Sequence, residues 1–321
     1  MNDRTALILG AHGRFGRAAV AAFVAAGWRT LAQSRKASPG LPAGAQALVG
    51  DLADLAGLAG RAAGASIVVH AANPPYDRWD ADMLPLAEQA IALAAELRAT
   101  LMLPGNVYGY GEAMPAVLAE HTPMQPSTAK GRLRVALEDA LRTAARDGRI
   151  PGAVVIRAGD FFGSGTGSWL DLAVLKSLGR GRLVYPGPLD RMHAWAYVPD
   201  LARAFAAVAG CRQLRPYEHI HFPGHALTGA ALLDAVEGAL RRLGRVPPGG
   251  LRRADMPWLA MRLGAPFVPM LREVLAMRYL WNVPHALAGK RLSELVGALP
   301  GTPIDEAMLA AVRDLTGGPG R

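Results

Sequence analysis

Three glycines near the N-terminus have the spacing of a phosphate-binding turn. They follow the apolar run 6–9 directly and open a helical stretch. Glycine lets the backbone approach a pyrophosphate closely, and a helix N-terminus offers unpaired N–H groups and a positive dipole end. The alternative is a purely structural glycine turn. Because the turn follows the first strand of the chain, we favour a dinucleotide site formed by Gly10, His12, Gly13, Arg14, Phe15 and Gly16.

The segment after the second expected strand indicates which dinucleotide is bound. A NAD site carries an acidic residue about 20 residues after the turn, where it binds the ribose hydroxyls. This chain has Ser34, Arg35 and Lys36 there. The guanidinium of arginine suits phosphate oxygens, and Arg14 is close enough in sequence to reach the same group. We therefore expect NADP(H) rather than NAD, the alternative being that these charges are only solvated.

Residues after the third and fourth expected strands complete this site. Asp51 and Leu52 stand where contacts with the adenine edge fall, and Ala71, Ala72 and Asn73 place small side chains beside the cofactor. In an open parallel sheet, ligands bind beyond the carboxyl ends of the strands. All five residues are therefore expected to contact the dinucleotide.

Lys130 and Arg134 form a second unusual pattern. They are like charges one helical turn apart, an arrangement that is unfavourable unless something anionic or functional lies opposite. Alternatively, Arg134 pairs with Glu138 and Lys130 points into solvent. The sequence leaves both interpretations open.

Strand-like and helical segments alternate through the first half of the chain. Such alternation predicts a doubly wound parallel sheet, the α/β Rossmann architecture, with helices on both faces. The expected strands are 6–9, 30–33, 47–49, 67–69, 101–103 and 154–156, and the clearest helices are 17–26, 84–97 and 133–145.

After Gly163 the pattern changes to a Gly/Ser run at 163–168, one strand near 194–198, and helices separated by Pro/Gly clusters. We expect a Rossmann domain over 1–165, to which a later strand and helix near 190–210 return. A smaller, mostly helical substrate-binding cap is expected over 166–189 and 211–321. The 163–168 loop and the later helices would then form the wall of the substrate site.

Composition limits the partners. The net charge of +9 comes from scattered arginines without a basic block, which argues against nucleic acid. No apolar run approaches the ~20 residues of a membrane span, and the single Cys211 with no Cys/His cluster argues against a metal site. We expect a cytoplasmic protein with a small-molecule substrate and no membrane partner. The oligomeric state stays open, with a homodimer as one option.

Seven segments jointly resemble the extended branch of the short-chain dehydrogenase/reductases, the NAD-dependent epimerase/dehydratase group. The resemblance covers nearly the whole chain and implies the fold above and an enzyme that binds NAD(P). The segments are 10–16, 50–52, 70–72, 107–109, 157–163, 197–200 and 301–303.

The same resemblance shows a departure. It places Pro104 at the family's catalytic serine, Lys130 at its tyrosine and Arg134 at its lysine, so the usual Ser-Tyr-Lys triad is absent. Residues 130–138 also resemble the helix that carries the catalytic lysine in isoflavone-reductase-like members of the superfamily. This second resemblance implies that Lys130 serves as proton donor or acceptor beside the cofactor, with Arg134 as its neighbour.

Four further residues are candidates for the substrate pocket. Asp160 falls where the family has an asparagine, and Asn106 and Tyr108 lie near the end of the fifth strand. Arg191 is placed to hold an anionic substrate group. The expected function is NADP(H)-dependent hydride transfer to or from a small carbonyl, alcohol or activated double bond. A nucleotide-sugar epimerase or dehydratase with a rebuilt site and a non-catalytic NADP(H)-binding regulator are the alternatives.

Overall fold

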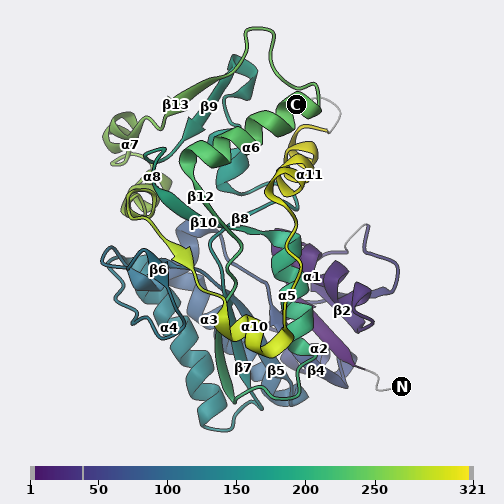
Figure 1. Cartoon of the computed structure of the whole chain (residues 1–321). Helices are drawn as coiled ribbons and strands as arrows, with labels where there is room; N and C mark the ends of the chain where they lie inside the picture. Colours follow the sequence, from purple (N-terminus) through teal and green to yellow (C-terminus); the bar gives the residue numbers. More distant parts are fainter. Residues whose placement is uncertain (1–3, 38–39, 318–321) are drawn as a thin grey trace.

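The computed structural model describes residues 4–37 and 40–317, and its larger part is built on a seven-stranded parallel sheet (Figure 1). The strand order is β11-β7-β5-β4-β1-β2-β3. These strands are β1 (Thr5–Leu9), β2 (Arg29–Ser34), β3 (Ala45–Val49), β4 (Ala65–His70), β5 (Thr100–Gly105), β7 (Ala153–Arg157) and β11 (Tyr217–His221).

Helices cover both faces of this sheet because its strands are apolar on both sides. Ala6 and Ile8 of β1 belong to one core with α1, α5 and α10, whereas Leu7 and Leu9 belong to the opposite core with α2, α3 and α4. This period of two follows from the alternation of side chains along a strand. The helices are α1 (Arg14–Ala25), α2 (Leu55–Arg61), α3 (Trp79–Leu97), α4 (Ala129–Arg146), α5 (Val198–Ala209) and α10 (Lys290–Val296).

A smaller region lies above the large sheet in Figure 1 and has its own core. Trp195 and Trp281 are buried in this core against α6 and α11. The elements here are β8 (Asp160–Phe162), β9 (Arg182–Tyr185), β10 (Met192–Tyr197), β12 (His225–Thr228), β13 (Arg252–Asp255), α6 (Gly229–Arg242), α7 (Trp258–Gly264), α8 (Pro269–Ala276), α9 (Tyr279–Asn282) and α11 (Ile304–Thr316).

Short elements join the two regions. β6 (Val117–Leu118) pairs with β14 (Ala286–Leu287), so a late segment of the chain lies beside an early one. The single-turn segments are η1 (Tyr76–Arg78), η2 (Tyr108–Tyr110), η3 (Leu170–Val174) and η4 (Leu178–Arg180). Among the residues that the structure describes, no helix is long and apolar enough to cross a membrane.

The expected architecture is present, with two corrections in the second half. The strand expected near 194–198 exists as β10, but it pairs with β8 and β12 in a three-stranded sheet instead of joining the large one. The seventh strand of the large sheet is β11, which lies in the range expected for the cap. The helix that follows β10, α5, packs against α1 and shares the core on one face of the large sheet.

Candidate functional site

The glycine turn lies between β1 and α1 and is closed so tightly that side chains do not fit. Gly10 has φ +73°, and a Cβ there would lie 2.6 Å from the Cα of Ala72. A Cβ on Gly16 would collide with the carbonyl oxygen of Gly10. Gly13 is the N-cap of α1 without a side-chain cap, and no acidic residue occupies the first turn. The N–H groups of this helix end are thus available to an anion, as a dinucleotide phosphate requires.

Gln33 holds the turn in place and was not identified from the sequence. Its Oε1 accepts the N–H of Gly10 at 3.0 Å, and its Nε2 donates to the carbonyl of Gly50 at 2.6 Å. The side chain therefore ties together the ends of β1, β2 and β3. The available signal was an amide at the end of the expected strand 30–33, where it is 2% exposed.

Two side chains of the turn serve the fold. The guanidinium of Arg14 donates to the carbonyls of Phe161 at 2.9 Å and Gly167 at 3.2 Å, so it fastens the 163–168 loop to α1. In this structure Arg14 is therefore directed to the 163–168 loop and β8, and its contact with a 2′-phosphate stays a prediction. The Phe15 ring packs against Phe205 in the core, with 4.9 Å between ring centroids. Phe15 can contribute only its backbone to a phosphate site, whereas Arg14 keeps further N–H donors and His12 is exposed beside them.

The segment after β2 is exposed on the surface. Ser34 is buried and its hydroxyl donates to the carbonyl of Lys36 at 2.6 Å, which shapes the turn, while Arg35 and Lys36 are exposed. After β3, Asp51 is exposed and accepts the N–H of Ala53, whereas Leu52 is buried in the core between the sheet and α2 and α3.

The residues that follow β4 lie beside the turn. The backbone of Ala71 and Ala72 lies next to Gly10, as the contacts of an added Cβ there demonstrate. Asn73 is exposed one residue further on. The segment 71–73, which we expected to face the cofactor, thus starts in contact with the glycine turn.

Lys130 is enclosed at the N-terminal end of α4. Its side chain is 3% exposed, and its Nζ donates to the carbonyl of Tyr76 at 2.6 Å and pairs with Glu273 Oε2 at 3.0 Å. The same nitrogen lies 4.0 Å from the ring centroid of Tyr76 and 5.0 Å from that of Trp79. The interpretation that Lys130 points into solvent is therefore wrong. Glu273 comes from α8, so the later half of the chain supplies the counter-charge.

Arg134 is partly buried, and it does not pair with Glu138. Its Nη2 donates to the carbonyl of Pro104 at the end of β5, and its guanidinium stands 5.5 Å from the Trp79 ring centroid. Burial lowers the pKa of Arg134, and burial together with Arg134 lowers the pKa of His70 to about 4. The histidine is therefore neutral at ordinary pH.

Three buried polar atoms near these residues have no partner within the described part of the chain. They are His70 Nδ1, Trp79 Nε1 and Arg134 Nε. His70 closes β4 and Arg134 reaches the end of β5, the edge of the sheet where ligands of such folds bind. Buried polar groups without a partner are uncommon in folded proteins. Together with the open helix end at Gly13, they fit a nicotinamide dinucleotide laid across the carboxyl ends of the strands.

Asp160 brings a carboxylate to this edge. Its Oδ2 bonds with Nε2 of His193 at 2.8 Å, and the His193 ring stacks parallel on Trp281 with 4.4 Å between centroids. Burial, with the Asp160 charge as a further cause, raises the pKa of Tyr76, Tyr108 and Tyr279 well above the usual value. These hydroxyls thus stay protonated and are donors, not bases.

The two other candidates for the substrate pocket lie differently. The Asn106 side chain accepts the backbone N–H of Tyr108 at 3.1 Å, so it shapes the turn after β5. Arg191 is exposed before β10 and its ion pair is with its neighbour Asp190 at 3.7 Å. Neither contact supports the substrate role that the sequence suggested.

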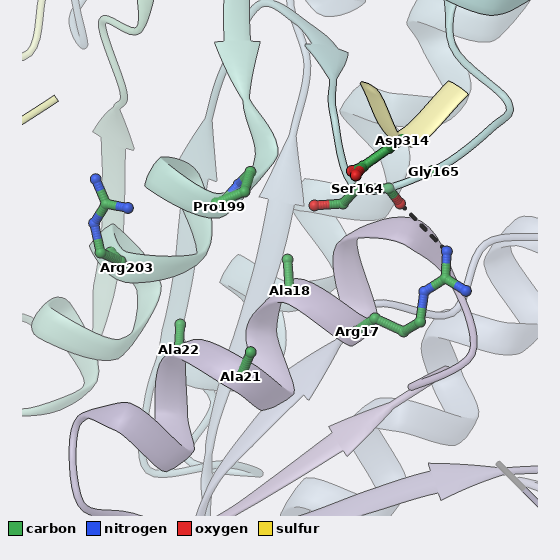
Figure 2. A pocket seen from close by; sticks show the side chains of 9 residues that line it. All are labelled: Arg17, Ala18, Ala21, Ala22, Ser164, Gly165, Pro199, Arg203 and Asp314. Carbon is green, nitrogen blue, oxygen red and sulfur yellow. Dashed lines mark hydrogen bonds between the residues drawn. The ribbon is translucent and has the colours of Figure 1, made fainter. Parts of the chain in front are cut away.

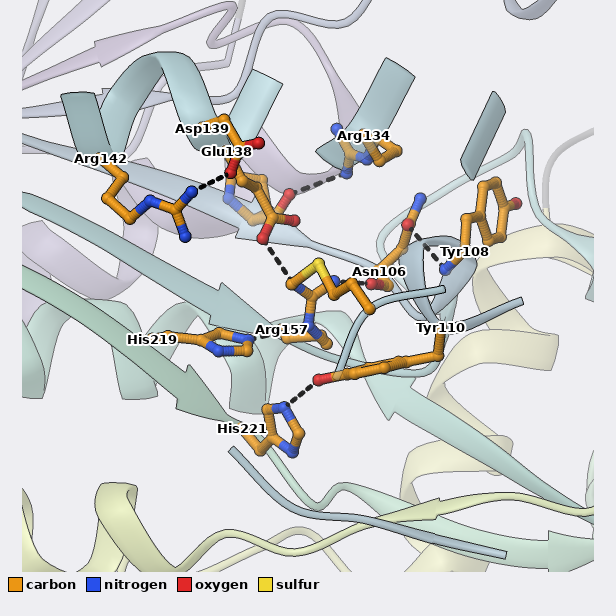
Figure 3. Close-up of polar contacts among 12 residues, drawn as sticks. Asn106, Tyr108, Tyr110, Arg134, Glu138, Asp139, Arg142, Arg157, His219 and His221 are labelled. Carbon is orange, nitrogen blue, oxygen red and sulfur yellow. Dashed lines mark hydrogen bonds and ion pairs between the residues drawn. The ribbon is translucent and has the colours of Figure 1, made fainter. Parts of the chain in front are cut away.

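A buried polar cluster around Arg157 lies next to the site and was also missed (Figure 3). Arg157 is fully buried, pairs with Glu138 Oε2 at 2.5 Å and donates to Nε2 of His219 at 3.0 Å. The hydroxyl of Tyr110 bonds with Nε2 of His221 at 2.7 Å beside it. Burial and the Arg157 charge lower the pKa of His219 to about 2 and that of His221 to about 4. This cluster joins β7, α4 and β11.

Two surface hollows lie outside the glycine turn and the Lys130 cluster. One of about 660 Å³ lies between α1, α5 and the 163–168 loop, with Arg17, Arg203 and Asp314 at its rim (Figure 2). The other, of about 330 Å³, borders the Arg157 cluster at Glu138 and His219. The first hollow is open to solvent and is lined by none of the residues that follow β4 and β5. We therefore place the candidate active site at the carboxyl ends of the parallel strands. In the described residues, no group of acidic, histidine or cysteine side chains is arranged to hold a metal ion.

Comparison with known structures supports the same fold. L-threonine dehydrogenase from Clostridium difficile is similar over 99% of this chain and 100% of that one, with 14% identity and a TM-score of 0.73. UDP-glucose 4-epimerase from Thermotoga maritima, solved with UDP-glucose, covers 97% and 98%, with 14% identity and a TM-score of 0.72. MoeE5, solved with UDP-glucose and NAD, covers 97% and 98%, with 15% identity and a TM-score of 0.71.

The search of curated proteins finds no match. A family model, in contrast, matches residues 6–220, which include the whole seven-stranded sheet except the first and last residues. With the glycine turn, the parallel sheet and the match over two thirds of its length, the chain belongs to the NAD-dependent epimerase/dehydratase family.

Proposed function

We propose that the chain is an NAD(P)-dependent enzyme of the epimerase/dehydratase type whose active centre is rebuilt around Lys130 and Glu273. The family supports the enzyme class, and relatives in structure act on nucleotide sugars, which makes a nucleotide sugar or a related hydroxyl-bearing molecule the first substrate to test. The observation that carries the proposal is the enclosed Lys130–Glu273 pair at the N-terminal end of α4, near the carboxyl ends of the strands.

A nicotinamide cofactor, when bound, donates a hydride to a carbonyl carbon or takes one from an alcohol carbon. The glycine turn would hold its pyrophosphate on the N-terminus of α1, and the exposed Arg35 and Lys36 would favour NADP(H) over NAD. Both residues lack a carboxylate neighbour in the segment 34–37. The family is described as NAD-dependent, so the preference for NADP(H) rests only on Arg35 and Lys36 of this chain.

Lys130 is placed to handle the proton. An ammonium group has three N–H donors, of which Tyr76 and Glu273 engage two. The third can donate to a substrate oxygen, so that the carbonyl oxygen gains a proton and Lys130 becomes a neutral amine. Glu273 is 34% exposed at its side chain whereas Lys130 is 3% exposed. The carboxylate therefore connects the buried amine to solvent and can return the proton.

The test compares Lys130→Met with Lys290→Met, which removes an exposed lysine of α10. Turnover is measured as NADPH or NADH oxidation on a panel of carbonyl compounds and 4-keto nucleotide sugars. A positioned acid or base contributes roughly 100- to 10,000-fold to a rate, so Lys130→Met should lose that factor while cofactor affinity changes only a few-fold. Full turnover by Lys130→Met would refute the assignment.

A second candidate is a non-catalytic NADP(H)-binding regulator. The observation that favours it is that Lys130 is already satisfied by Glu273 and Tyr76, as a structural ion pair would be. In that case the wild type binds NADPH tightly and oxidises it with no member of the panel. Glu273→Gln distinguishes the two, because it should change the pH profile of an enzyme but only the stability of a regulator.

A further inference from the structure

The pair of helices α7 and α8 exposes a row of large apolar side chains that no other part of the described chain covers. Leu259, Leu263 and Phe267 are 73%, 70% and 85% exposed, and no residue of either helix is buried. They follow one another at intervals of four residues, so the first two lie on one face of α7 and the third extends that face into the turn before α8. Val268 and Met270 continue the patch onto α8. We call residues 258–276 the hairpin.

Side-chain contacts fix the hairpin to the rest of the protein. The indole N–H of Trp258 donates to the carbonyl of Pro186 at 2.8 Å, and Arg278 stacks 5.1 Å over the Trp258 ring. From α8, Glu273 pairs with Lys130. The inward residues are thus anchored, and the apolar row is presented outward at the edge of the molecule, where Figure 1 places α7 and α8.

Arginines precede, interrupt and follow this row in the sequence. The exposed arginines Arg252, Arg262 and Arg272 have no ion-pair partner among the described residues. Of the two acidic residues between 252 and 278, Glu273 pairs with Lys130 and Asp255 is exposed on β13, so the exposed arginines outnumber the exposed carboxylates. The chain as a whole carries a net charge of +9. Apolar side chains flanked by free arginines are the pattern of helices that lie in the interface of an anionic bilayer.

We propose that the hairpin docks the protein on the surface of an anionic lipid bilayer, with Leu259, Leu263 and Phe267 inserted among the acyl chains. A second copy of the chain fits less well, because it would bring the same unpaired arginines against these ones. Phe267, which is 85% exposed in the turn between α7 and α8, also suits insertion into a lipid phase. This inference revises the sequence-based expectation of no membrane partner, which rested only on the lack of a spanning segment, and it does not depend on the proposed reaction.

The experiment is co-sedimentation of the full chain with vesicles of phosphatidylcholine alone or mixed with phosphatidylglycerol. We expect binding to the anionic vesicles that weakens as salt rises, and at least about tenfold weaker binding for Leu259→Ser/Phe267→Ser. Arg262→Glu/Arg272→Glu should lose the preference for phosphatidylglycerol. Val117→Ser, which changes a side chain of similar exposure on β6, is the matched control and should bind as the wild type does.

A gain-of-signal variant guards against loss of folding. Phe267→Trp keeps the apolar character, and its added indole emission should shift to the blue on anionic vesicles and not on phosphatidylcholine alone. The proposal is overturned if the wild type co-sediments with neither kind of vesicle. It is equally overturned if the chain is dimeric by light scattering and Leu259→Ser/Phe267→Ser makes it monomeric, since the row would then be a subunit interface.

Discussion

Two neighbouring acidic residues of α4 sit in opposite surroundings, and their energetic roles differ accordingly. Glu138 is buried and pairs with the fully buried Arg157, whereas Asp139 pairs with Arg142 at the surface. Removing one partner of a buried pair leaves an uncompensated charge, which costs about 3–5 kcal/mol, while an exposed pair contributes about 0–1 kcal/mol. We expect Glu138→Ala to lower the free energy of unfolding by several kcal/mol in urea titrations. Asp139→Ala, one residue on, is the control, and equal losses for the two would contradict this view.

Cofactor choice also rests on single residues. Arg35 is exposed directly after β2, where it is free to meet a 2′-phosphate. Replacing it by Asp repels that phosphate and offers a carboxylate to ribose hydroxyls, so we expect the preference to move from NADPH to NADH. Fluorescence titration of both cofactors measures it. Arg29→Asp changes an exposed arginine at the opposite end of the same strand and should leave the ratio of NADPH to NADH affinity unchanged. Equal affinities of the wild type for NADPH and NADH would contradict the proposed preference.

At the scale of the element, the turn from β1 into α1 requires glycine, because the backbone leaves no room for a Cβ atom at positions 10 and 16. A Cβ at position 16 meets the carbonyl oxygen of Gly10, so Gly16→Ala must open the turn and move the N–H groups of α1. We expect NAD(P) affinity to fall at least about tenfold, the cost of roughly one lost charge-assisted hydrogen bond. Gly60→Ala provides the comparison, because nothing lies within 4 Å of its added Cβ. Unchanged affinity in Gly16→Ala would place the pyrophosphate elsewhere.

The strands of the large sheet that contain an apolar run were predicted from the sequence, and the one that is mostly polar was not. All six strands expected in the first half are present in the large sheet. Most of them are buried on both faces, and parallel strands so buried are largely apolar in sequence, whereas the edge strand β3 is mostly exposed and shows only a short apolar run. β11 escaped because its sequence, Tyr-Glu-His-Ile-His, is mostly polar. Its polar side chains find their partners far away in the sequence, Arg157 for His219 and Arg291 for Glu218.

The candidate site was predictable only in its local parts. The glycine turn and the pair Lys130 and Arg134 have spacings that the sequence displays directly. Glu273 has no such spacing, because it meets Lys130 through the folding of α8 against η1, and Gln33 acts through a side chain within an ordinary strand. The contacts of Arg14 with Phe161 and Gly167 were not predictable, because the position of a residue in the sequence does not specify the direction of a long side chain.

At the scale of the molecule, buried histidines make stability depend on pH. Burial lowers the pKa of His70, His221 and His285 to about 4 and that of His219 to about 2. An unfolded histidine titrates near 6.5, so below that pH the unfolded chain binds more protons than the folded one. We expect the free energy of unfolding to fall as pH drops from about 6.5 toward 4, by up to about 1.4 kcal/mol per pH unit for each histidine.

Urea titrations at a series of pH values measure this slope. His221→Gln should make it shallower by about one proton, whatever the variant does to absolute stability. His121→Gln, at an exposed histidine, should leave it unchanged. A flat profile between pH 6.5 and about 4 would contradict the burial of these rings in the neutral form.

The position of β11 at the edge of the sheet has a consequence for the order in which the protein is made. Chains emerge from the ribosome N-terminus first and begin to fold as they do. β7 must therefore wait, with its edge open, while β8, β10 and α5 are synthesised before β11 appears. An open strand edge is a template for pairing with another chain. We expect fragments that stop before Tyr217 to aggregate, and a ribosome that pauses in this interval to leave the nascent sheet dependent on a chaperone.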